Sequence, residues 1–74
     1  MPGLTVADIE DIFTYHSPTP DQLPKYEAIR NQAKVMALTI MENTPSGPDQ
    51  TVAIRKLREA TMTANACIAL GGKY

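Results

Sequence analysis

The sequence predicts an all-α protein in which a short N-terminal helix precedes an antiparallel hairpin of two long helices, assembled into a helical homo-oligomer. Apolar residues recur at helical spacing in three segments, and clusters of proline and glycine separate those segments. The chain has only 74 residues and a single cysteine. A chain of this length forms one domain at most, which we place at residues 1–74.

A capping pattern opens the first helix, which we expect over about residues 6–13. Thr5 is followed three residues later by Asp8, in the arrangement of a capping box with Asp in place of the usual Glu or Gln. One helical face then carries the apolar residues Val6, Ile9 and Phe13. The segment HSPTP ends this helix, because each proline pushes the residue before it toward an extended conformation.

The second helix is expected over about residues 20–43. The segment TPDQ has Thr19 at the N-cap, Pro at the first helical position and Gln at the third. A start at Asp21 fits nearly as well. Pro24 is an irregularity in the first turn, where the loss of one backbone N–H costs least.

The third helix is expected over about residues 49–70, after the turn NTPSGPDQ. Gly71 and Gly72 end it, at positions where a left-handed residue is favoured. Because the turn is short, the two long helices should pack antiparallel.

The apolar stripes of the two long helices predict a second buried face. They comprise Leu23, Tyr26, Ile29, Ala33, Met36, Ala37 and Ile40 in the second helix, and Ala53, Leu57, Ala60, Ala64, Cys67 and Ile68 in the third. Further apolar residues widen each stripe beyond what one partner helix covers. A scaffold this small needs a disulfide, a metal or oligomerisation. With one cysteine and one histidine in the chain, we expect an obligate oligomer.

Charge and hydropathy indicate the cellular compartment of the protein and the kinds of partner that it lacks. Seven basic and eight acidic residues give a net charge of −1, without the basic face that binds long DNA or RNA. The segment MPGLTVADIE lacks the pattern of a signal peptide. The apolar run VMALTIM is far shorter than the ~20 residues that span a bilayer. We therefore expect a cytoplasmic protein with neither nucleic-acid polymer nor membrane as partner.

The sequence offers few combinations of residues that could support catalysis. A Cys–His pair would need Cys67, near the end of the last helix, to meet His16 in the first loop. The acidic residues Asp8, Glu10 and Asp11 fit a solvated first-turn face that favours the helix dipole. No glycine spacing matches a nucleotide-binding loop. We expect no enzyme, no cofactor and no metal site.

Basic residues and one tyrosine are the candidates for ligand binding. Arg30 and Lys34 share a face at i, i+4. A second basic group consists of Arg55, Lys56 and Arg58. The simpler interpretation is that these are solvated faces that pair with Glu27, Glu42 and Glu59, and that Tyr15 packs over a helix end.

Two ordered blocks resemble a known family, the bacteriophage anti-CBASS cyclic-nucleotide sponges, whose hairpin domain is shared with the anti-Thoeris sponges. The first block is FTYHSPTPDQ followed by KYEAIR, and the second is KLREATMTANACIA. The resemblance implies a phage anti-defence protein in the host bacterial cytoplasm. Such a protein sequesters cyclic dinucleotides such as 3′,3′-cGAMP without cleavage, and compact hexamers bind them between subunits.

The resemblance also assigns site residues. The family's base-stacking tyrosine corresponds to Tyr15, and its phosphate-binding lysine or arginine to Arg30, with Lys34 as the alternative. His16 and Thr19 are nearby loop candidates. An aromatic ring can stack on a base and a guanidinium can grip a phosphate through two hydrogen bonds.

Two positions depart from the family pattern. Some members also bind cyclic trinucleotides at a three-fold site, where a basic residue follows the second block. This chain has Leu70 there, and Lys73 lies beyond the glycines, which argues against that ligand class. Pro24 stands where the family has an acidic residue and could shift the helix start.

Two other functions are the alternatives. The second is a small helical adaptor that binds another protein, and the third is an enzyme that degrades the same nucleotides.

Overall fold

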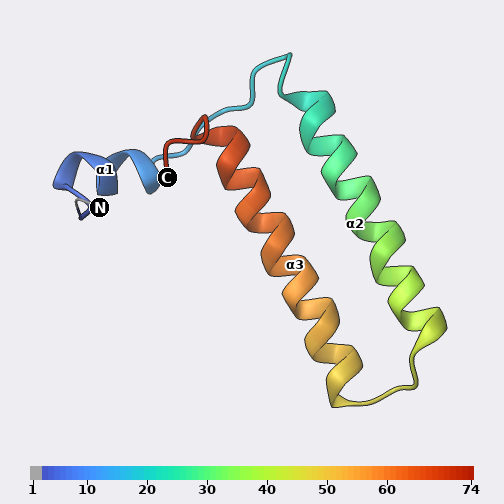
Figure 1. Ribbon diagram of the computed structural model, residues 1–74. Helices are drawn as coiled ribbons and strands as arrows, with labels where there is room; N and C mark the ends of the chain where they lie inside the picture. The colour runs from blue at the N-terminus through green and yellow to red at the C-terminus, as the bar shows by residue number, and fades with distance from the viewer. Residues whose placement is uncertain (1–2) are drawn as a thin grey trace.

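Three α-helices and no strand make up residues 3–74, the part of the chain that the computed structural model describes (Figure 1). They are α1, Val6–Ile12; α2, Leu23–Asn43; and α3, Pro48–Ala69. The prediction of an all-helical chain with three helices is confirmed. The helices α2 and α3 lie side by side, the chain reverses in the short turn between them, and α1 lies beyond the other end of α3 (Figure 1).

The predicted capping box forms at the start of α1. The backbone N–H of Asp8 donates to the Thr5 hydroxyl oxygen at 3.1 Å, and the Asp8 carboxylate accepts from the Thr5 N–H at 2.8 Å. The helix ends at Ile12, and the Phe13 N–H closes the last turn on the Ile9 carbonyl at 3.1 Å. The cap satisfies two donors that a helix start leaves without intrahelical partners.

The start of α2 lies at Leu23, so the predicted start at Pro20 and the alternative at Asp21 are both wrong. Pro24 has no N–H, and the α-helical hydrogen bond to the Pro20 carbonyl cannot form. A separate turn forms before α2 instead. Within it the Gln22 N–H donates to the Thr19 carbonyl, and the Thr19 N–H donates to the Gln22 side-chain oxygen, both at 3.0 Å.

The end of α3 has the geometry that Gly71 and Gly72 predict. Both glycines have positive φ, 65° and 74°, and so lie in the left-handed region. The Gly72 N–H donates to the Cys67 carbonyl at 3.0 Å, and the Gly71 N–H donates to the Ile68 carbonyl at 3.3 Å. This is the double hydrogen bond of a Schellman motif. The helix therefore stops at Ala69, one residue earlier than expected, and the chain turns away from its axis.

The single chain has no enclosed core. Among residues 3–74 none is fully buried, and α1 approaches neither α2 nor α3 closely along the backbone. The radius of gyration is 15.6 Å, whereas a compact domain of this length would have about 11 Å. Large apolar side chains that are at least half exposed on the long helices are Leu23, Val35, Met36, Leu38, Met41 and Met62. In the described part of the chain, no helix combines the length and the apolar character needed to cross a bilayer.

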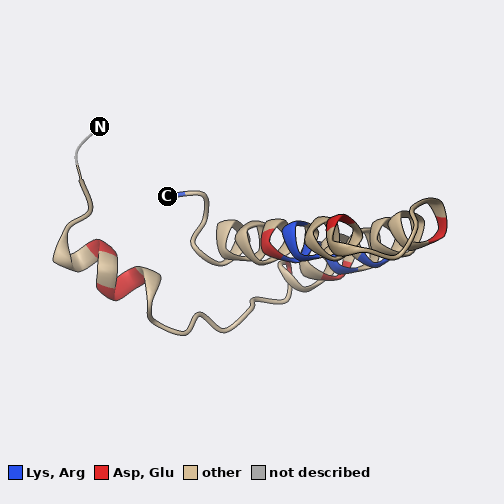
Figure 2. Ribbon diagram, turned by 90° about the horizontal axis from the view of Figure 1, so that it is seen from below, with Lys and Arg blue, Asp and Glu red and all other residues tan. Residues whose placement is uncertain are grey.

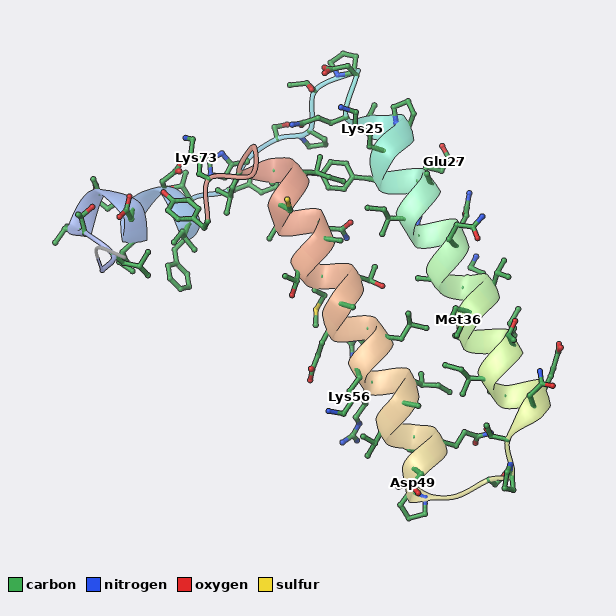
Figure 3. All side chains as sticks on the ribbon, viewed as in Figure 1. Lys25, Glu27, Met36, Asp49, Lys56 and Lys73 are labelled. Carbon is green, nitrogen blue, oxygen red and sulfur yellow. The ribbon has the colours of Figure 1, made fainter. Side chains whose placement is uncertain are left out.

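The C-terminal tail connects back to α1. The Tyr74 hydroxyl lies 3.0 Å from the Asp11 carboxylate and 3.4 Å from that of Asp8. The Lys73 ammonium lies 3.5 Å from the same Asp11 oxygen, and Figure 3 shows Lys73 beside α1. Acidic residues are the only charged residues on α1, whereas α2 and α3 carry both signs (Figure 2). The tail is thus attached to an acidic helix by polar contacts.

We expect α1 to fray in acid. Hydrogen bonds from the Thr5 backbone N–H, and secondly from the Thr5 side chain, lower the pKa of Asp8 below its ordinary 3.8. The ionised carboxylate therefore stabilises α1 above about pH 3.8, and this stabilisation disappears as the pH falls through the lowered value. Carbon chemical shifts of residues 6–12, measured by NMR from pH 7 to pH 2, report the helix directly.

Thr5→Ala is the matched variant for this acid transition. It removes the cap hydroxyl, which generally costs about 1 kcal/mol of helix stability, and should reduce the helical shifts of α1 already at pH 7. Thr39→Ala, on the exposed face of α2, is the control and should leave α1 unchanged, because its hydroxyl donates only to the Val35 carbonyl of the same helix. A Thr5→Ala chain whose α1 signals match wild type across the titration would contradict the capping role.

Candidate ligand-binding site

Two neighbouring grooves lie where the loop before α2 crosses the open end of the long helices. The first, which we call the Tyr15 groove, has a volume of about 300 Å³ and is lined by Ile12, Thr14, Tyr15, His16, Tyr26, Asn65, Ala66, Ala69 and Leu70. The second, the Arg30 groove, has a volume of about 430 Å³ and is lined by His16, Pro18, Leu23, Tyr26, Arg30, Thr61 and Asn65. His16, Tyr26 and Asn65 line both grooves, so the two form one continuous surface.

Tyr15 presents an open aromatic ring at the rim of its groove. Tyr15 is 82% exposed, although hydrogen bonds fix the residue before it and the residue after it. The Thr14 hydroxyl donates to the Glu10 carbonyl of α1, and His16 bonds to Asp11. Because the Tyr15 ring is exposed, it can stack on a flat ligand without losing packing contacts within the protein.

His16 is tied to α1 rather than exposed to solvent on all sides. Its Nε2 lies 2.8 Å from the Asp11 carbonyl oxygen and 3.5 Å from the Asp11 carboxylate. A carbonyl oxygen only accepts hydrogen bonds, so Nε2 carries the hydrogen, and Nδ1 is the acceptor of the neutral ring. His16 therefore acts first as a structural link, and it has one nitrogen left for a ligand.

Arg30 and Lys34 lie one turn apart on α2 and border a third groove. This groove has a volume of about 260 Å³ and is lined by Arg30, Ala33, Lys34, Ala37, Ile54, Leu57, Arg58, Thr61 and Met62. Its floor is apolar and its rim is cationic. The expected pairing of the helix cations with Glu27, Glu42 and Glu59 is wrong, because both ion pairs found in residues 3–74 involve Asp11. The guanidinium and ammonium groups thus remain available to an anion.

Thr19 is separated from the other candidates. Its hydroxyl donates to the Asp21 carboxylate at 2.6 Å, in the turn that precedes α2, and it lines none of the three grooves. This hydrogen bond is the first cause of the lowered pKa of Asp21. The structure therefore brings Tyr15 and His16 together, connects them to Arg30 through shared lining residues, and leaves Thr19 at the periphery.

Sequence reasoning missed two residues of this surface. Tyr26 was assigned to the apolar stripe, and Asn65 was given no role. Both line the Tyr15 groove and the Arg30 groove. The side-chain oxygen of Asn65 is buried and has no hydrogen-bond partner among residues 3–74. An amide between alanines at the end of an Ala-rich helix was the signal that could have indicated it.

The surface suits a flat anionic ligand, since it combines an exposed aromatic ring with a cationic side chain. Within residues 3–74, no group of three or more His, Cys, Asp or Glu side chains is placed to hold a metal ion. Cys67 is exposed on α3 and does not line either groove that contains His16.

Fold and surface together define a small all-α protein with open grooves at one end of its two long helices. The chain matches the family described as Acb2/Tad1, hairpin domain, over residues 6–69. That match includes most of the chain, and the protein belongs to this family. The resemblance inferred from the two sequence blocks is thereby confirmed, and the membership fits a phage anti-defence sponge role. The chain matches no curated protein and no solved structure.

We expect Asn65→Leu to separate stability from binding. The unpaired buried oxygen costs about 1–3 kcal/mol in general, and an apolar side chain of similar size removes this cost. The melting temperature without ligand should therefore not fall, while affinity for a ligand that pairs with the amide should drop. Scanning calorimetry beside ligand titration checks both halves. A marked loss of stability with unchanged affinity would show that the amide has a structural partner instead.

Proposed function

We propose that the protein binds and sequesters cyclic dinucleotides such as 3′,3′-cGAMP without cleaving them, and so keeps CBASS-type immune effectors inactive during phage infection. It acts as a single domain of residues 1–74 in a homo-oligomer, a hexamer by analogy with its family, in the host bacterial cytoplasm. Tyr15 stacks on a base, Arg30 binds a phosphate with Lys34 as the alternative, and His16 and Thr19 are secondary candidates.

The observation that carries the proposal is the exposed Tyr15 ring beside a surface that continues to Arg30. A cyclic dinucleotide offers base faces for stacking and phosphates for a guanidinium. His16, Tyr26 and Asn65 line both grooves and join the two parts of the surface. In the proposal, one half of the ligand contacts both Tyr15 and Arg30. Arg30 has no acidic partner within 4.0 Å in the described chain, which supports its role toward a phosphate.

A shared site between subunits follows from the symmetry of the ligand. A cyclic dinucleotide has two bases and two phosphates, whereas one chain provides one Tyr15 and one Arg30. A two-fold interface gives each half the same contacts. The open grooves and the exposed apolar residues of α2 and α3 support such an assembly, because neither is covered in the single chain.

Cyclic trinucleotides stay an open second ligand class of the proposal, against which one departure from the family pattern stands, and cleavage lies outside the proposal. Leu70 stands where other members have the basic residue of the trinucleotide site, and the Lys73 ammonium faces Asp11. Cleavage is excluded from the proposal, because the family is non-catalytic in general. Sequestration needs only tight binding.

The decisive experiment is calorimetric titration with 3′,3′-cGAMP, followed by denaturation and recovery of the nucleotide. We expect tight binding and intact nucleotide. Tyr15→Ala removes two stacking contacts per ligand at a two-fold site and should lose about 2–6 kcal/mol of binding free energy. Phe13→Ala is the matched control, since Phe13 is 81% exposed and lines neither the Tyr15 groove nor the Arg30 groove. Altered nucleotide would indicate an enzyme, and equal affinity of Tyr15→Ala and wild type would contradict the site.

Arg30→Ala tests the phosphate contact in the same assay. Affinity should fall, and the dependence of wild-type affinity on salt should weaken in the variant, because a charge pair has been removed. Arg55→Ala, on α3 and outside the three grooves, should retain wild-type affinity.

The assembly is tested by light scattering at micromolar concentration. We expect six chains of 8.1 kDa each, about 49 kDa in total. A stable monomer would contradict the shared site. An oligomer that binds no cyclic nucleotide, but captures a protein from the host, would support the adaptor function that the exposed apolar residues of α2 and α3 also permit.

A further inference from the structure

We propose that Lys73 and Tyr74 are positioning residues for the binding loop, because they fix Asp11 and Asp11 fixes His16, the neighbour of Tyr15. The inference rests on the proposed function and assigns a role to residues outside the grooves that bind the ligand. We call the four side chains Asp11, His16, Lys73 and Tyr74 the clasp.

Asp11 is the centre of the clasp. One carboxylate oxygen accepts from the Tyr74 hydroxyl at 3.0 Å and faces the Lys73 ammonium at 3.5 Å. The other oxygen lies 3.5 Å from His16 Nε2, and the Asp11 carbonyl oxygen lies 2.8 Å from the same nitrogen. The Asp11 side chain is 28% exposed, the His16 side chain 32%. The contact between Asp11 and His16 is less screened than that of a fully exposed pair, whereas the Lys73 side chain is 65% exposed and its ion pair with Asp11 is screened more strongly.

The clasp replaces packing that α1 lacks. Because α1 approaches neither long helix along the backbone, its orientation depends on contacts at its C-terminal end. Ile12 lines both the Tyr15 groove and a separate groove of about 430 Å³ that includes Lys73 and Tyr74. Ile12 therefore lies between the groove of the binding loop and the groove of the tail.

The direction of the tail is set by backbone geometry. Gly71 and Gly72 turn the chain through two residues with positive φ, and Tyr74 then reaches an aspartate that is 63 positions earlier. Desolvation of the hydroxyl, and then its hydrogen bond to Asp11, raise the pKa of Tyr74 to about 12. The raised pKa extends the pH range over which the hydroxyl keeps its proton and donates to Asp11.

Three tail variants test the clasp in the full chain. Lys73→Ala with Tyr74→Phe removes the polar contacts, whereas Lys73→Arg retains the cation. Gly72→Ala strains a residue at φ 74° and should misdirect the tail with its side chains intact. Lys56→Ala is the control, since Lys56 lies on the side of α3 away from α2 (Figure 3) and takes no part in the clasp.

Two measurements distinguish positioning from a general effect. If the binding-competent loop falls to about one tenth of its population, affinity for 3′,3′-cGAMP falls about tenfold. His16 is the only histidine, so its imidazole NMR signals report the loop without ligand. We expect weaker binding and shifted His16 signals in the double variant and in Gly72→Ala, with an unchanged melting temperature in the double variant. Lys73→Arg and Lys56→Ala should resemble wild type.

Each contrary result has a separate meaning. His16 signals that do not move in the double variant overturn the positioning role, even if affinity falls, because the tail would then contact the ligand itself. A lower melting temperature of the double variant that accounts for its lost affinity also overturns it. If neither wild type nor any variant binds the nucleotide, the proposed function is wrong. The His16 signals of the double variant then still show whether the clasp fixes the loop.

Discussion

Two helices lying side by side can shield only one stripe of each other's surface, and the other features of this protein follow from that limit. No residue among 3–74 is fully buried, so the chain gains little from an enclosed core. Local interactions fix the helix ends and the tail, where larger domains rely on core packing. They are the cap at Thr5, the glycine stop after α3 and the polar contacts of Asp11. The same limit leaves grooves open at the surface, where a ligand and a second chain can both reach them.

Features of the fold that depend on neighbours in sequence were predictable. The capping box and the double-glycine stop each involve residues a few positions apart. Each motif can be recognised from the types of these residues alone. The start of α2 was not predicted correctly, although Pro24 was recognised as irregular. Its missing N–H breaks the bond to Pro20, and the TPDQ segment satisfies its own hydrogen bonds as a separate turn.

Features of the site that join distant segments were less accessible to sequence reasoning. Tyr15 and Arg30 were assigned through the family resemblance, and only the structure relates them, by way of Tyr26 and Asn65. Tyr26 has the spacing of a stripe residue, and its second role follows from where the loop crosses the helices. The attachment of the tail to Asp11 spans more than sixty positions, and no local pattern encodes such a pairing.

The two ends of the long helices are chemically unequal. One end holds the loop, the tail, the Tyr15 groove and the Arg30 groove. The other end, roughly 30 Å away along a helix of α2's length, is the turn between Asn43 and Pro48. Lengthening a surface turn costs little conformational entropy. Variation in length among related chains should therefore concentrate at this turn. A fluorophore placed there would report on the protein without touching the surface proposed to bind the ligand.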